Sequence, residues 1–164
     1  MFLKRFLLLI VIPLLFIACS SNEEPPKDHP RKNIHKINKE DLPKCIKVLF
    51  VTQPHCPSCE ALQSTMQQPI PQTLLNDYFE IETIFLGKKL PDGLIPPNGT
   101  PTVYFLGYQD EPLIEPMVGE KTEEDLMMFL EDALFEFKHL YGVDLVEQKK
   151  GETNETNETN QTIH

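Results

Sequence analysis

The sequence of 164 residues contains no tryptophan, only seven glycines and only four cysteines. Four cysteines are too few to hold together a disulfide-rich scaffold, although they suffice for one special site. Basic residues are also few: 15 Lys and Arg stand against 25 Asp and Glu, and the net charge is −10. Nucleic-acid-binding proteins usually present a basic face, so we expect no nucleic acid partner.

The rest of the composition is typical of a globular protein. Hydrophobic residues make up 40% and charged residues 24% of the chain, which excludes a wholly disordered or fibrous protein. The length favours one domain with tails. Fifteen prolines against seven glycines indicate many stiff turns.

The N-terminus has the pattern of a secretory signal. Lys4 and Arg5 precede an apolar run at 6–18, which is shorter than the roughly 20 residues that a membrane-spanning helix needs. Cys19 follows the run directly. The positive end, the short apolar stretch and the small residue at its end predict a signal peptide over residues 1–18.

Residues 15–19 (LFIAC) resemble the lipobox of bacterial lipoproteins, with Phe16 where leucine is usual. The resemblance implies that Cys19 is acylated and becomes the N-terminus of the mature chain. It also implies, from Ser20, export to the outer membrane. We therefore expect a lipid-anchored periplasmic protein of the bacterial cell envelope. An ordinary signal with a chance cysteine and a weak membrane anchor are the alternatives.

The mature chain is expected to have three parts. Residues 19–36 hold one strong hydrophobe and three prolines and cannot bury a core, so they predict a flexible tether. Residues 37–146 carry the apolar patterns of a folded domain. Residues 147–164 include a three-residue repeat and only one hydrophobe, and they predict a disordered tail.

The tail offers three Asn-x-Thr sites, each with a glutamate two residues before the asparagine. This pattern resembles the extended acceptor sequence of bacterial N-glycosylation. A repeat without any modification is the alternative. The candidate glycosylation sites are Asn154, Asn157 and Asn160.

Within the domain, apolar runs and alternating patterns predict strands and helices. Pro57 suits the first turn of a helix, Pro69 and Pro71 interrupt it, and a second short helix is expected through Leu74, Leu75 and Tyr78. Thr122 is expected to cap a third helix, which ends at Gly142. The four predicted strands are 46–52, 79–86, 102–106 and 113–118.

The order of these elements predicts a mixed sheet with flanking helices. A helical crossover between the first two strands implies parallel pairing, and a tight turn at 107–110 implies antiparallel pairing of the last two. Residues 87–99, with three prolines and three glycines, predict a loop. The fold class is therefore α/β.

Cys56 and Cys59 lie in the run CPSC, where the first strand gives way to the helix. Two cysteines at this spacing can close a small disulfide. The positive end of the helix dipole favours the Cys56 thiolate and lowers the pKa of this thiol, as a nucleophile requires. Cys59 would then resolve a mixed disulfide. There are two alternatives. The pair could be half of a zinc site, completed by Cys45 and His55. It could also be a purely structural disulfide.

At this point the sequence resembles the thioredoxin family over about residues 46–141. Two motifs carry the resemblance, CPSC at 56–59 and Gly-Thr-Pro-Thr at 99–102. The resemblance implies a thioredoxin fold, with a mixed four-stranded sheet and flanking helices. It also implies a cis-proline at Pro101, packed against the disulfide.

The same resemblance implies a substrate-binding edge around the cysteines. Thr100 would offer backbone hydrogen bonds to the substrate chain, next to Pro101. His55, Pro57 and Ser58 would line the site. No cofactor and no resident metal are implied.

Some positions depart from the family pattern. His55 replaces the usual aromatic residue before the first cysteine, and Phe50 stands where many thioredoxins carry a buried acid. A charged His55 would stabilise the Cys56 thiolate and make the pair more oxidising; otherwise it is an exposed polar residue lining the site. Cys45 is expected to be buried beside the first strand, with pairing to another protein as the alternative.

The leading hypothesis is an envelope-anchored thiol-disulfide oxidoreductase that acts on substrate proteins with cysteines. Reduction is favoured, with electrons from a membrane donor, and a disulfide oxidase or isomerase is the alternative within this class. A copper- or zinc-binding thioredoxin-fold protein would use Cys56, Cys59 and His55 as ligands. A non-catalytic surface module is a third hypothesis.

Overall fold

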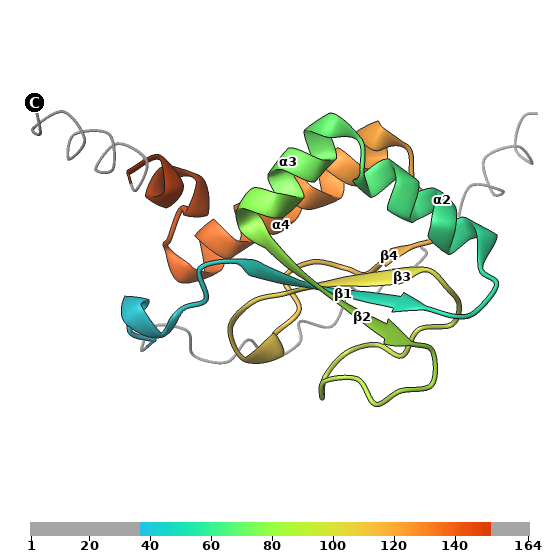
Figure 1. The fold of residues 1–164 in the computed structure, drawn as a ribbon. Coiled ribbons are helices and arrows are strands. Elements are labelled where there is room, and N and C mark those ends of the chain that lie inside the picture. Colours follow the sequence, from blue (N-terminus) through green and yellow to red (C-terminus); the bar gives the residue numbers. More distant parts are fainter. Residues whose placement is uncertain (1–36, 152–164) are drawn as a thin grey trace, which may run out of the picture. The chain divides into compact units, whose positions relative to one another are not determined.

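Figure 1 shows the computed structural model of the chain, which describes residues 37–151. The predictions for the signal peptide, the lipid-carrying Cys19, the tether and the three glycosylation sites lie outside the described residues. None of the helices described is both long and apolar enough to cross a membrane.

Four strands form a mixed sheet: β1 (Ile46–Thr52), β2 (Phe79–Phe85), β3 (Thr102–Leu106) and β4 (Met117–Val118). Their order across the sheet is β2-β1-β3-β4 (Figure 1). β1 and β2 pair in parallel, whereas β3 pairs antiparallel with both β1 and β4. This arrangement confirms the predicted α/β fold of the thioredoxin type, with flanking helices.

Two short helices, α2 (Pro57–Met66) and α3 (Pro69–Tyr78), connect β1 to β2. Each begins with a proline, whose fixed φ and missing N–H suit the first helical turn. Pro69 also prevents α2 from continuing, because a proline ring clashes inside a helix and restricts the residue before it. The helical crossover accounts for the parallel pairing of β1 and β2, and both predicted helices are confirmed.

Helix α4 (Glu123–Tyr141) begins and ends where its capping residues predict. The Asp125 N–H donates to the Thr122 hydroxyl, with 3.1 Å between the nitrogen and Oγ1. Gly142 ends the helix at a φ of 66°, a left-handed conformation that glycine adopts without steric cost. The buried side chains recur at helical spacing along one side: Leu126, Leu130, Ala133, Phe137 and Tyr141.

The three helices α2, α3 and α4 lie on one face of the sheet (Figure 1). Their buried side chains and those of β1 and β3 form the main hydrophobic core, in which Phe50, Phe105 and Phe137 are almost completely buried. Cys56 and Cys59 belong to the same core cluster. The start of α2 is therefore fixed by packing that extends through the whole helical layer.

The opposite face of the sheet is covered differently. Leu49, Val51, Tyr104 and Leu106 form a second buried cluster on β1 and β3, and the partly buried side chains packed against it are Ile84, Leu90 and Leu94. Leu90 and Leu94 belong to the connection from β2 to β3, which contains no helix, as its prolines predict. A loop therefore takes the place of a helix on this face of the described domain.

The last strand is shorter than predicted. A strand at 113–118 was expected, but only Met117–Val118 pairs regularly with β3. Proline has no N–H for a sheet, so Pro112 and Pro116 limit regular pairing in this segment. What remains is an isolated bridge between Leu106 and Pro112. In the predicted turn before it, Gln109 and Asp110 have φ values of 55° and 60°, in the left-handed region.

The predicted boundary of the folded part at residue 146 is too early, because residues 145–151 are helical. Asp144 explains this extension: its Oδ1 accepts the N–H groups of Val146 and Glu147, at 3.0 and 3.1 Å. Leu145 is buried against the core. Residues 147–151 (EQKKG) contain no hydrophobe, so their composition gave no sign that the helix capped by Asp144 continues through them.

We expect replacement of Asp144 by alanine to cost about 1 kcal/mol, the usual cost of losing a helix N-cap. The Lys138 ammonium, 2.8 Å from the carboxylate, holds the pKa of Asp144 below its ordinary value, with help from the N–H groups. The carboxylate therefore stabilises the fold above the ordinary carboxyl pKa, and this contribution disappears as pH falls through the lowered pKa. Urea unfolding of both proteins between pH 7 and pH 2 measures it.

The matched control is Asp92→Ala. The Asp92 side chain is 94% exposed and only pairs with Lys89 at 3.7 Å, and such surface pairs contribute little. This variant should unfold like the parent protein. A stability difference for Asp144→Ala that stayed constant down to pH 2 would contradict the assigned role of the carboxylate.

Candidate active site

The site begins where β1 ends and the chain turns into α2. His55, in the connecting segment, has a φ of 55°, in the left-handed region. Cys56 then takes the N-cap position of α2 with an extended backbone. Its sulfur accepts the Cys59 N–H, with 3.2 Å between nitrogen and Sγ. The Cys56 sulfur therefore occupies the place of a capping oxygen, at the positive end of the helix.

Cys56 and Cys59 are joined by a disulfide. Little of either residue is exposed to solvent: Cys56 is 6% and Cys59 is 3% exposed. Cys56 lies at the N-cap of α2, and Cys59 lies inside the first turn of this helix.

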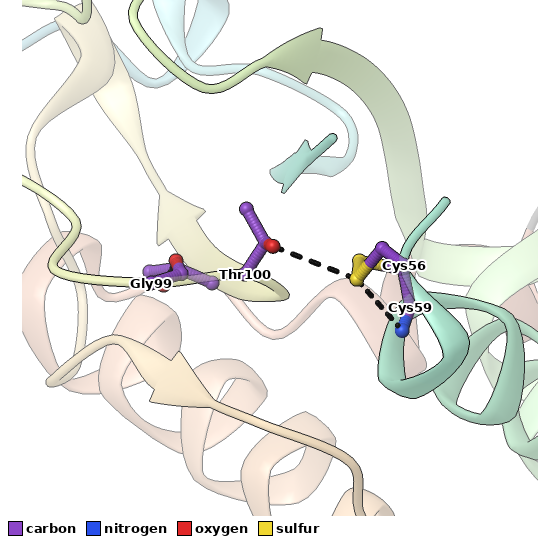
Figure 2. The surroundings of a disulfide bond; sticks show 5 residues. Cys56, Cys59, Gly99 and Thr100 are labelled. Atoms are coloured by element: carbon purple, nitrogen blue, oxygen red, sulfur yellow. Dashed lines mark hydrogen bonds between the residues drawn. A yellow bond between two sulfur atoms is a disulfide. The ribbon is translucent and has the colours of Figure 1, made fainter. Parts of the chain in front are cut away.

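The loop before β3 approaches the disulfide from another part of the chain (Figure 2). The Thr100 Oγ1 lies 3.5 Å from the Cys56 Sγ. A disulfide sulfur carries no proton, so the hydroxyl is the donor in this contact. The Thr100–Pro101 peptide bond is cis. The Cys56 sulfur thus receives two donors, one from α2 and one from this loop.

A third segment completes the arrangement after β4. The Gly119 N–H donates to the Pro101 carbonyl, at 2.9 Å. Gly119 has a φ of 78°, which favours glycine at this turn. Thr65 of α2 donates to the carbonyl of Lys121, at 3.0 Å, and so ties the same segment to α2. The segment 119–121 therefore links the loop that carries Pro101 to helix α2, which carries the disulfide.

The structure brings together most of the site residues expected from the sequence. Thr100 contacts the Cys56 sulfur, and the buried Pro101 follows it. His55 and Pro57 are exposed on either side of Cys56 in the sequence, and Ser58 is half-buried. The residues that flank Cys56 in the sequence are therefore accessible to solvent, fully at His55 and Pro57 and in part at Ser58.

Cys45 does not join this site. It precedes Ile46 at the start of β1, whereas Cys56 follows the end of that strand. It is a free thiol and only half-buried, less than the burial that we expected. In the part of the chain from 37 to 151, no group of three or more His, Cys, Asp or Glu side chains is placed to hold a metal ion.

Two residues support the site in ways that the sequence did not indicate, although Thr102 belongs to the motif at 99–102. The Thr102 hydroxyl donates to the Gly99 carbonyl at 2.8 Å, and the Tyr104 hydroxyl donates to the Ile95 carbonyl at 2.7 Å. Burial raises the pKa of Tyr104, so its phenol keeps the donated proton at all ordinary pH values. The only sequence signal was the alternation of polar groups in a strand that is otherwise apolar.

Neither a protein-family model nor a curated protein matches the sequence significantly. Among solved structures, the chain is similar to the reduced form of the periplasmic thioredoxin SoxS from Paracoccus pantotrophus, with 19% identity over 56% of this chain and 97% of that one, at a TM-score of 0.43. A thioredoxin from Thermus thermophilus has 18% identity over 57% and 76%, at 0.46. The disulphide isomerase from Xylella fastidiosa Temecula1 has 14% identity over 54% and 77%, at 0.39.

The observed topology and the position of the disulfide define the fold. The parallel β1-α2-α3-β2 unit is followed by the antiparallel strands β3 and β4 and by α4. A Cys-x-x-Cys disulfide caps the helix that follows β1. The described part of the chain therefore has a thioredoxin-like fold, with a disulfide at the start of α2.

Proposed function

We propose that the protein is a thiol-disulfide oxidoreductase that acts on disulfides of other proteins. The observation that carries this proposal is the environment of the Cys56 sulfur. It accepts the Cys59 N–H, lies 3.5 Å from the Thr100 hydroxyl and stands at the N-terminus of α2. All three features favour a thiolate when the disulfide is reduced, and the thiolate is the species that exchanges.

The proposed direction is reduction of the substrate. The Cys56 thiolate attacks one sulfur of a substrate disulfide, and the other substrate sulfur leaves as a thiolate that takes up a proton. The Cys59 thiol then loses its proton and attacks the Cys56 sulfur of the mixed disulfide, which releases the second substrate thiol. The substrate gains two electrons and two protons, and the Cys56–Cys59 disulfide forms.

A dithiol donor must return these two electrons, and we propose that the donor is a membrane protein. Lipid attachment at Cys19, a tether over 19–36 and a periplasmic, outer-membrane location are part of the same proposal, supported by the sequence pattern. The exposed edge formed by His55, Pro57 and Ser58 would contact the substrate. Backbone groups at Thr100, before Pro101, would hold its chain.

The test is capture of a mixed disulfide. In Cys59→Ala, the attacking sulfur remains but the resolving thiol is gone, so the substrate is expected to stay attached to Cys56. Non-reducing gel electrophoresis with a disulfide-containing protein should show a new band that dithiothreitol removes. The same variant carrying Cys45→Ala should give the same band. If the band depended on Cys45, or if none formed, the proposal would be wrong.

The direction of exchange has its own measurement. A reductant should have a reduction potential below about −250 mV, near the thioredoxin value, and an oxidase one near about −120 mV. Equilibration of the Cys56–Cys59 pair with glutathione buffers gives this value. A potential near the oxidase value would mean that the protein oxidises or isomerises disulfides rather than reducing them. It would also point to His55 as the cause of the high potential.

A further inference from the structure

The segment that carries Thr100 to the disulfide has little packing of its own. Pro96 and Asn98 are exposed, and Gly99 is only half-buried. A Cβ atom placed on Gly99 would have no heavy atom within 4 Å apart from its chain neighbours. Side-chain packing therefore does little to fix the backbone on the N-terminal side of Thr100, whereas the buried Pro101 follows on the other side.

Two hydroxyls from β3 hold this segment instead. Thr102 and Tyr104 are two residues apart, so their side chains lie on the same face of the sheet. They are 1% and 2% exposed, and they donate to the carbonyls of Gly99 and Ile95. A buried hydroxyl without a partner costs free energy, so both bonds are strongly favoured.

We propose that Thr102 and Tyr104 are positioning residues, which fix the segment 95–99 on β3 and so keep the Thr100 hydroxyl within reach of the Cys56 sulfur. The inference rests on the proposed function, because it assigns these hydroxyls a role in thiol reactivity. The Gly99 carbonyl that Thr102 holds is adjacent to Thr100 in the chain. The Thr100 Oγ1 lies 3.5 Å from the Cys56 Sγ, and this contact depends on where the segment holds Thr100, so a displacement of the segment weakens it.

The measurement is the pH dependence of Cys56 alkylation in the reduced full-length protein. Peptide mass spectrometry assigns the modification to Cys56 and separates it from the other cysteines. Thr102→Val removes the hydroxyl at nearly constant volume. We expect the pKa of Cys56 to rise by about half a unit to one unit, so that alkylation below that pKa slows about three- to tenfold. Thr102→Ser keeps the hydroxyl and should restore the parent profile.

Tyr104→Phe should shift the profile in the same direction by less, because it releases Ile95, which lies further from Thr100. Thr73→Val is the matched control, since the Thr73 hydroxyl donates to the Pro69 carbonyl at 2.8 Å on the exposed side of α3. It should leave the profile unchanged. Urea unfolding of each variant separates a local shift from a loss of the fold, and Tyr104→Phe tests the inference in the case in which Thr102→Val does not fold.

A double-variant comparison decides whether the hydroxyls act through Thr100. Thr100→Val alone should raise the pKa of Cys56, and Thr102→Val added to it should have no further effect. An unchanged profile in Thr102→Val or in Thr100→Val would overturn the inference, and so would a full Thr102→Val shift in the Thr100→Val background. Alkylation needs no protein substrate, so failure to trap a mixed disulfide would reject the proposed function without deciding this result.

Discussion

Replacing Cys56 by serine is expected to lower the rate of disulfide exchange at least about a thousandfold. A serine hydroxyl is almost wholly protonated at neutral pH and cannot form a disulfide, so the first step has no nucleophile. The Cys56 sulfur is the one that accepts the Cys59 N–H and lies near the Thr100 hydroxyl. The rate of reduction of a protein disulfide, with dithiothreitol as electron donor, measures the loss.

The control for this prediction is Cys45→Ser. Cys45 is a half-buried thiol before β1, whereas the disulfide follows the end of this strand, so the exchange rate should stay within about twofold of the parent rate. Exchange that survived in Cys56→Ser but disappeared in Cys45→Ser would place the nucleophile at Cys45 and contradict the site. Both serine variants should retain the helical signal in circular dichroism.

Local chemistry explains which elements could be predicted from the sequence. Pro57 and Pro69 set the starts of α2 and α3, and Thr122 and Gly142 set the ends of α4. These residues act on their own backbone and their nearest neighbours, so their effect can be inferred without knowing the tertiary structure. The position of CPSC at the start of α2 follows from the same reasoning.

Other features depend on contacts that the sequence does not display. The Asp144 cap extends the fold past residue 146. Leu145 is buried in the core, and the Lys138 ammonium pairs with the Asp144 carboxylate. β2 alternates polar and apolar residues, yet Ile81 and Phe85 are 45% and 54% exposed, because this strand lies at the edge of the sheet. Alternation predicted the strand correctly, but burial depends on which elements cover it.

The supports of the candidate site belong to this second group. Thr102 and Tyr104 matter only because the connection from β2 to β3 crosses their face of the sheet as a loop. A helix in that place would satisfy its own backbone, whereas a proline-rich loop leaves carbonyls that need donors. Because no helix lies there, the loop depends on the two buried hydroxyls of β3 as donors to its carbonyls. The segment that these hydroxyls hold leads directly to Thr100.

The largest expected effect on stability is that of Phe137→Ala in α4. Phe137 is 0% exposed in the main core, and its ring meets that of Tyr141 edge to face at 4.8 Å between centroids. Truncation of a buried phenylalanine costs about 3–5 kcal/mol, through lost burial and the cavity left behind. Since many domains are stable by only about 5–15 kcal/mol, urea unfolding should show a large fall in midpoint.

Phe135→Ala provides a control two residues away on the same helix. Phe135 is 65% exposed and stacks only on the His139 ring, so its loss should change the unfolding free energy by less than about 0.5 kcal/mol. Equal effects of the two variants would mean that the side of α4 that carries Phe137 does not face the core.

Because Cys56 and Cys59 belong to the same core cluster as Phe137, a destabilised α4 should also loosen the start of α2. Exchange activity should then fall at lower temperature in Phe137→Ala than in Phe135→Ala.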